Sequence, residues 1–198
     1  MMVKLRLENR MVVVIGASDE AVQRANSFAN QGARVLLVGT PAGGWASLIS
    51  VQDDSSMSCR YAKRPSRKDL KRAALVVATD RDDVINTWLS DKAKRYRFLL
   101  NTLDVPEYCD YYHVAIRRPH LDIEIGVSTD GHSPAFASSL ATRLAKTVTD
   151  DDCHTYEVLK QIRQQLRQQG QSPSSLDWVQ LELETRQSRL RETRQAQL

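Results

Sequence analysis

The sequence lacks an apolar run long enough to cross a membrane, and it has few cysteines. Its longest apolar run is residues 11–17, whereas a membrane-spanning helix needs about 20 apolar residues. The segment before that run is rich in charged residues, so it contains no apolar signal-peptide core. The three cysteines, Cys59, Cys109 and Cys153, form neither a CxxC pair nor a disulfide framework. These absences predict a cytoplasmic protein with no membrane segment.

The net charge of the chain is also small. The 198 residues carry a formal net charge of +4, with 41% hydrophobic and 26% charged residues. These are globular values, which exclude a disordered chain or a coiled-coil rod. Residues 154–198 hold seven Lys/Arg against five Asp/Glu, too balanced for a nucleic-acid-binding tail. No two of the four histidines have a metal-ligand spacing such as HxxxH. We therefore expect neither nucleic acid nor a metal as a ligand.

The first hundred residues alternate between two hydrophobic periods. Residues 11–15 form a continuous β-branched run, which is typical of a strand buried on both faces. A helical pattern over residues 19–30 follows, and then a second apolar strand over residues 34–38. Further strands are expected at residues 57–61, 75–78 and 98–101, and a helix at residues 82–94. This alternation predicts an open, doubly wound α/β sheet.

The pattern changes after about residue 110. Strands are expected at residues 112–116 and 121–127, the second with alternating apolar residues that bury one face. Ser133 and Pro134 have the character of an N-cap and a first helical residue, and the helix runs to about residue 148 with Phe136, Leu140 and Leu144 on one face. A segment this small cannot bury both apolar faces alone, so we expect a homodimer formed mainly by residues 112–148. Residues 149–198 read as two helices separated by a break at residues 170–175.

The turn after the first strand is a candidate phosphate-binding loop. A dinucleotide fingerprint there would read G-x-G-x-x-G/A. Gly16 and Ala21 fit it, but Ser18 replaces the middle glycine. Asp19 opens the following helix and would repel a phosphate at that helix end. The loop alone fits a dinucleotide site and an ordinary strand–helix turn equally well.

Two other strand ends carry candidate residues. The second strand ends in Gly39-Thr40-Pro41, without the acidic residue that usually holds the ribose hydroxyls. Either backbone groups hold the ribose or this is not a nucleotide site. Asp104 follows the last strand, at the edge where ligands bind in such sheets. It is either a positioned carboxylate or a cap for the turn before Pro106.

Cationic side chains gather in two segments. Arg117, Arg118 and His120 connect the two later strands, and His132 stands beside the helix start at Ser133. Residues 63–72 form a denser basic run. Both segments suit an anionic ligand, although a charge run is more often a solvated face.

Four segments together resemble a known family. The family segment ATDD…N is similar to Ala78-Thr79-Asp80 with Asn86, and the family segment NVVD is similar to residues 101–104 (NTLD). The family segment PELCDF is similar to residues 106–110 (PEYCD), and STGGxSPA is similar to residues 127–135 (VSTDGHSPA). Over residues 3–148 the chain thus resembles the siroheme synthase N-terminal family, the precorrin-2 dehydrogenases. The resemblance implies a Rossmann domain (residues 1–111), a small α/β dimerisation segment (112–148) and a C-terminal helical region (149–198).

The resemblance also implies an activity and a site. The reaction would be the NAD-dependent oxidation of precorrin-2 to sirohydrochlorin, with Asp104 as the catalytic residue. The implied cofactor-binding residues are Gly16, Ala17, Ser18, Asp19, Gly39, Thr40, Pro41, Thr79, Asp80 and Asn101. The tetrapyrrole-binding residues would be Arg117, Arg118, His120, Ser128, Thr129, His132 and Ser133. The family normally has three glycines in its loop. The alternative is therefore a sirohydrochlorin chelatase or tetrapyrrole-binding homologue that has lost dehydrogenase activity because its loop is Gly-Ala-Ser.

Overall fold

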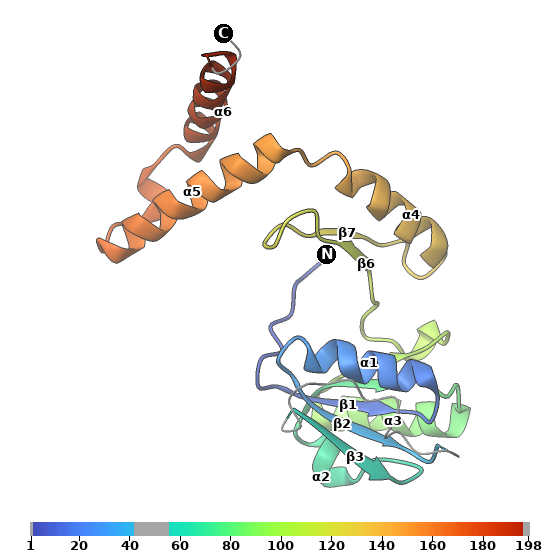
Figure 1. The fold of residues 1–198 in the computed structure, drawn as a ribbon. Coiled ribbons are helices and arrows are strands. Elements are labelled where there is room, and N and C mark those ends of the chain that lie inside the picture. Colours follow the sequence, from blue (N-terminus) through green and yellow to red (C-terminus); the bar gives the residue numbers. More distant parts are fainter. Residues whose placement is uncertain (1, 42–55, 196–198) are drawn as a thin grey trace. The chain divides into compact units, whose positions relative to one another are not determined.

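The computed structural model describes residues 2–41 and 56–195. The chain divides into two compact units, Met1–Tyr112 and His113–Leu198. Figure 1 shows that the first unit is a sheet flanked by helices, whereas the second is mostly helical. Within the described residues, no helix is long and apolar enough to span a bilayer.

The first unit is built on a parallel sheet. Its described strands lie in the order β3-β2-β1-β4-β5, all parallel. Their bounds are Met11–Ile15 (β1), Arg34–Gly39 (β2), Met57–Tyr61 (β3), Ala73–Ala78 (β4) and Leu99–Thr102 (β5). The chain runs outward from β1 to β3 and then returns to the other side of β1. This confirms the predicted doubly wound α/β fold and places its topological switch point between β1 and β4.

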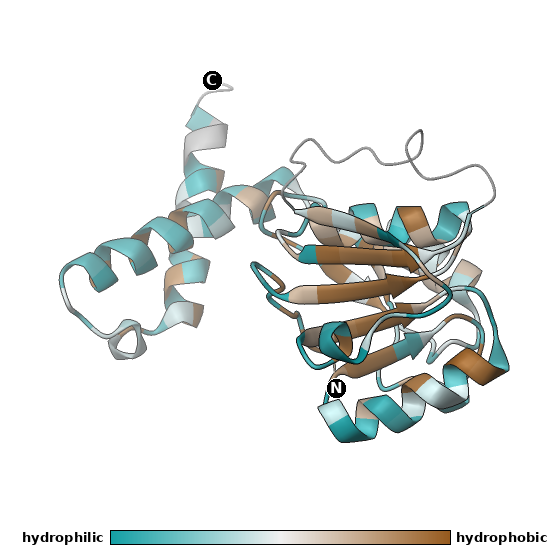
Figure 2. Cartoon of the chain, turned by 90° about the horizontal axis from the view of Figure 1, so that it is seen from below, coloured by the Kyte–Doolittle hydropathy of each residue, from teal (hydrophilic) through white to brown (hydrophobic). Residues whose placement is uncertain are grey.

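The apolar run of β1 is buried from both sides. Val12 and Val14 pack with the apolar face of α1 (Asp19–Ala29). Val13 and Ile15 pack instead with Leu70 and with residues of α3 (Asp83–Tyr96), on the opposite face. Most strands of the sheet are accordingly hydrophobic along most of their length in Figure 2. A short helix, α2 (Arg67–Leu70), and a 3-10 turn, η1 (Pro106–Tyr108), complete this unit.

In the second unit, the described strands are shorter than predicted. β6 (Ala115–Arg117) and β7 (Ile125–Val127) form an antiparallel pair. The predicted strand over residues 121–127 is wrong in its first half, where the chain bends and Leu121 is 90% exposed. One reason is that Tyr156 and Lys160, from a following helix, hold the Asp122 carboxylate at 3.0 and 2.5 Å.

Helix α4 (Pro134–Ala145) packs on this hairpin through small side chains. Its buried residues are Ala137 and Ala141, whereas Phe136 is 54% exposed and Leu144 is also exposed. Phe136 and Leu144 are therefore left uncovered within this unit, as expected of a segment too small to bury its apolar faces alone. The alanines permit close approach of the helix to the strands, which leaves the larger apolar residues outside.

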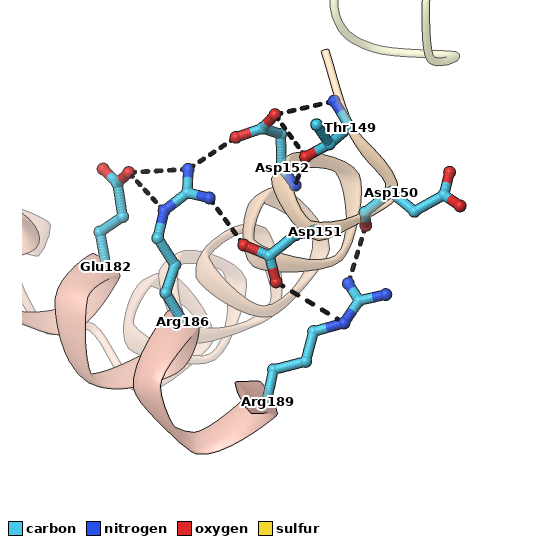
Figure 3. A network of polar contacts seen from close by, with 7 residues as sticks. All are labelled: Thr149, Asp150, Asp151, Asp152, Glu182, Arg186 and Arg189. Atoms are coloured by element: carbon cyan, nitrogen blue, oxygen red, sulfur yellow. Dashed lines mark hydrogen bonds and ion pairs between the residues drawn. The ribbon is translucent and has the colours of Figure 1, made fainter. Parts of the chain in front are cut away.

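Two long helices end the chain, α5 (Asp150–Gln168) and α6 (Trp178–Gln195), with a 3-10 turn, η2 (Pro173–Ser175), between them. An ionic network joins the two helices (Figure 3). Arg186 donates to Asp151 and Asp152, both at 2.8 Å. Asp152 also accepts hydrogen bonds from the backbone and the hydroxyl of Thr149 in a capping box. The Thr149 groups, and then Arg186, lower the pKa of Asp152 to about 2.

Candidate functional site

The turn after β1 is fixed by a glycine that no other residue can replace without strain. Gly16 has φ +154°, and its N–H donates to the Val38 carbonyl at 2.9 Å. A Cβ at this position would lie 1.9 Å from Oγ1 of Thr79 and 2.8 Å from Oδ1 of Asp80. The ends of β1 and β4 therefore meet in direct contact at the switch point, where an open α/β sheet binds its ligand.

The remainder of this loop is surrounded by carboxylates. The Ala17 N–H donates to Oδ1 of Asp80 at 3.1 Å. Ser18 is the N-cap residue of α1, but its side chain forms no capping hydrogen bond. Asp19 and Glu20 occupy the first turn of the helix. The helix dipole favours an anion here, but these carboxylates oppose one.

A pocket of about 290 Å³ opens at the carboxyl edge of the strands. It is lined by Ile15, Gly39, Thr40, Lys63, Ala78, Asp80, Asp82, Ile85 and Asn86. Three predicted cofactor residues, Gly39, Thr40 and Asp80, thus come together from β2 and from the end of β4. Pro41, which follows Thr40, is partly buried.

Asn86 is the most informative residue of this pocket. Its side chain is 1% exposed, and neither Oδ1 nor Nδ2 has a hydrogen-bond partner among the described residues. A buried polar group without a partner costs about 1–3 kcal/mol, so such a group normally has a partner in the protein, in ordered water or in a ligand. Sequence reasoning noted Asn86 only within a family segment, because its burial and missing partners become visible only in the fold.

Asp104 lies just beyond β5, at the same edge of the sheet, and is exposed. Nε of Arg81 donates to Oδ2 of Asp104 at 2.7 Å, and Nη2 donates to the same oxygen. This hydrogen bond raises the pKa of Arg81. Both residues have left-handed backbones, with φ +59° for Asp104 and +51° for Arg81. Such strained positions cluster at functional sites, and the catalytic role of Asp104 stays a prediction.

Two other predicted cofactor residues have structural contacts. The Asn101 amide donates to the Tyr111 carbonyl at 2.9 Å and is buried. The Thr79 hydroxyl donates to the Ile15 carbonyl at 3.2 Å. Thr79 therefore supports the Gly16 turn, and Asn101 holds the segment that leaves the sheet.

The cationic side chains of the second unit that are predicted to bind the substrate have partners inside that unit. Arg117 donates to the hydroxyls of Thr142 at 3.0 Å and Ser138 at 2.8 Å. Arg118 pairs with Glu124 at 2.7 Å, and Nε2 of His120 lies 3.7 Å from the carboxylate of Glu157. These three side chains join the hairpin to its neighbours in the fold.

The turn before α4 is more open. Thr129 accepts the Ser133 N–H at 3.1 Å, and Ser128 contacts Asp130. The Ser133 hydroxyl makes no capping bond, and His132 is exposed. His132 and the Ser133 hydroxyl, which is partly buried, are therefore open to a ligand in this turn.

Comparison with known proteins places this geometry in context. A family model described as "Putative NAD(P)-binding" matches residues 3–115. Siroheme synthase from Methylococcus capsulatus is 26% identical over 166 residues, which cover 83% of this chain and 34% of that protein. Siroheme synthase from Nitrosospira multiformis is 28% identical over 145 residues, covering 71% and 30%. The chain thus spans about a third of the length of these relatives.

Among solved structures, SirC, a precorrin-2 dehydrogenase, superposes with a TM-score of 0.65 at 19% identity. The match covers 98% of this chain and 99% of that one, and it shows a shared fold. Together, these matches confirm the resemblance to the siroheme synthase N-terminal region.

Proposed function

This chain belongs to the NAD(P)-binding family matched by residues 3–115, and we propose that it oxidises precorrin-2 to sirohydrochlorin in siroheme biosynthesis. A nicotinamide dinucleotide is the hydride acceptor, NAD+ in the reaction that the resemblance implies. The observation that carries the nucleotide site is the pocket at the switch point, which is lined by Asn86, a residue whose buried amide has no hydrogen-bond partner among the described residues. The likeness to siroheme synthases supports the substrate class.

The pocket residues suit a nucleotide in several respects. Gly39 presents no side chain at the end of β2, which permits close approach of a ribose. Asn86 offers one donor and one acceptor group to the polar edge of a base or amide. The Ser18 hydroxyl replaces a glycine backbone contact and can donate to a phosphate. The bound dinucleotide supplies the hydride chemistry, and the protein orients it.

Asp104 takes the proton in this proposal. Precorrin-2 loses a hydride to the nicotinamide and a proton to a base, and general base catalysis is typically worth about 10²–10⁴ in rate. Arg81 is then a positioning residue, because its two N–H groups hold one carboxylate oxygen. The other oxygen, Oδ1, is left to accept the proton.

The substrate is a polycarboxylate, so it needs cations and hydrogen-bond donors around it. His132 and the Ser133 hydroxyl at the start of α4 are the donors that we propose. We also propose a homodimer through the second unit, because Ile116, Leu121 and Phe136 are exposed there. Light scattering that gives the mass of one chain at micromolar concentration contradicts the dimer.

A second function is favoured by one contact. The Asp80 carboxylate accepts the Ala17 N–H, a group that a bound pyrophosphate would otherwise use. With Ser18 in place of glycine, this contact supports a tetrapyrrole-binding protein or chelatase that has lost its dehydrogenase activity.

Calorimetric titration with NAD+ and with sirohydrochlorin separates the two functions. The dehydrogenase proposal expects heat from both ligands and tighter NAD+ binding in Ser18→Gly, which restores the backbone approach. Heat from sirohydrochlorin, with none from NAD+ or NADP+ in a folded sample, supports the second function and contradicts the first.

A further inference from the structure

Strand pairing carries a lysine to the nucleotide pocket. β3 runs parallel to β2, with Tyr61 opposite Gly39. The Ala62 N–H then donates to the Gly39 carbonyl at 3.1 Å, which extends this pairing by one residue. Lys63 is the next residue, and it lines the pocket together with Gly39 and Thr40. The backbone position of Lys63 beside the pocket is therefore set by the register of the sheet.

The end of β2 is where dinucleotide-binding sheets distinguish their two cofactors. A carboxylate there accepts the ribose 2′-hydroxyl of NAD, whereas a nearby cation accommodates the 2′-phosphate of NADP. Gly39, Thr40 and Pro41 include no carboxylate, and Thr40 brings a hydroxyl that can donate to a phosphate. The described groups at this position thus suit a phosphate better than a hydroxyl.

The two carboxylates of the pocket lie toward its other side. Asp80 and Asp82 follow β4, and β1 separates β4 from β2, so the two strand ends are roughly 10 Å apart. Asp80 accepts the Ala17 N–H. Asp82 caps α3 by accepting the N–H groups of Val84 and Ile85 at 2.9 and 3.0 Å. Within the part of the chain that the structure describes, Lys63 forms no ion pair, so its charge remains available.

We propose that Lys63 and Thr40 bind the 2′-phosphate of NADP+, so that this pocket takes NADP+ at least as tightly as NAD+. The proposal rests on the proposed nucleotide site and deepens it. It changes only the acceptor that the site selects, because both cofactors carry the same nicotinamide.

The test uses fragments that differ by this one phosphate. Adenosine 2′,5′-bisphosphate and adenosine 5′-monophosphate are titrated calorimetrically into the wild-type chain and into Lys63→Ala, Lys63→Arg and Lys71→Ala. Lys71 is the matched control, because it belongs to the same basic run but stacks on Tyr96, 5.9 Å from the ring centre. The wild-type chain should bind the bisphosphate at least about tenfold more tightly, since a charge-assisted contact is worth that factor or more.

Lys63→Ala should remove this preference and leave the monophosphate affinity unchanged, whereas Lys63→Arg and Lys71→Ala should keep it. If the wild-type chain binds the monophosphate and NAD+ but gains nothing from the 2′-phosphate, the phosphate assignment is wrong and the nucleotide site stands. An equal loss of both fragments in Lys63→Ala also overturns the assignment. If neither fragment nor NAD+ binds, the proposed nucleotide site fails and this inference fails with it.

Discussion

Replacing Gly16 by alanine tests the contact between the ends of β1 and β4. The new Cβ would meet Oγ1 of Thr79 at 1.9 Å, in a backbone conformation with φ +154° that side chains rarely adopt. Because Thr79 is buried and bonded to the Ile15 carbonyl, its side chain cannot simply rotate into solvent. Gly16→Ala should therefore destabilise the first unit and not merely alter ligand affinity.

The expected loss has two parts. The backbone strain costs about 1–3 kcal/mol. Overpacking in a filled site costs about 1–3 kcal/mol more. The matched control is Gly32→Ala, because Gly32 has φ +78° but its Cβ would meet Glu8 only at 3.6 Å, an ordinary contact. That variant should show backbone strain alone, about 1–2 kcal/mol.

Amide hydrogen exchange in β1 and β4 measures these losses within the unit concerned, since each 1.4 kcal/mol raises the exchange rate of globally protected amides about tenfold. A third variant makes the test specific. In a Thr79→Ala background the Oγ1 contact is absent, so Gly16→Ala should cost at least about 1 kcal/mol less than in the wild type. Equal losses in the two backgrounds, or a Gly16→Ala loss no larger than that of Gly32→Ala, would refute the contact.

Three other changes have defined outcomes. Asp104→Asn should lower the rate of sirohydrochlorin formation at least about 100-fold. The free energy of unfolding should change by less than about 1 kcal/mol, because the ion pair with Arg81 is exposed. Normal turnover would remove Asp104 from the catalytic role. Asn86→Leu should raise the urea midpoint, because a buried amide without partners is removed, and should weaken nucleotide binding; a stability loss with unchanged binding contradicts the assigned role. Asp152 has its folded-state pKa lowered to about 2, so its stabilisation is present above the unfolded value of about 3.9 and is lost as pH falls toward 2. Circular dichroism should therefore show that α5 and α6 lose helicity over this pH range in the wild type but not in Asp152→Asn.

The sheet could be predicted because its strands carry a simple signal. Residues 11–15 and 35–38 are apolar at every position, a pattern typical of a strand that is covered on both faces. The pocket edge was partly predictable for a related reason. The carboxyl ends of parallel strands share one edge, so Thr40 and Asp80 are expected at the same edge of the sheet.

The remaining site residues depend on information that a linear pattern does not contain. Lys63 reaches the pocket through the register of β3 on β2, and Asn86 is significant because packing leaves it without partners. Arg117 is a further example. Its charge indicates an anionic substrate, and only the fold shows that its guanidinium donates hydrogen bonds to hydroxyls of α4.

The proposed oxidation is tested most directly by mixing the purified chain with precorrin-2 and a nicotinamide dinucleotide while recording the absorbance of both products. The dehydrogenase account predicts that sirohydrochlorin and the reduced nucleotide appear together in equal amounts, with NAD+ and with NADP+. A folded chain that binds the tetrapyrrole but forms no reduced nucleotide with either cofactor would contradict it.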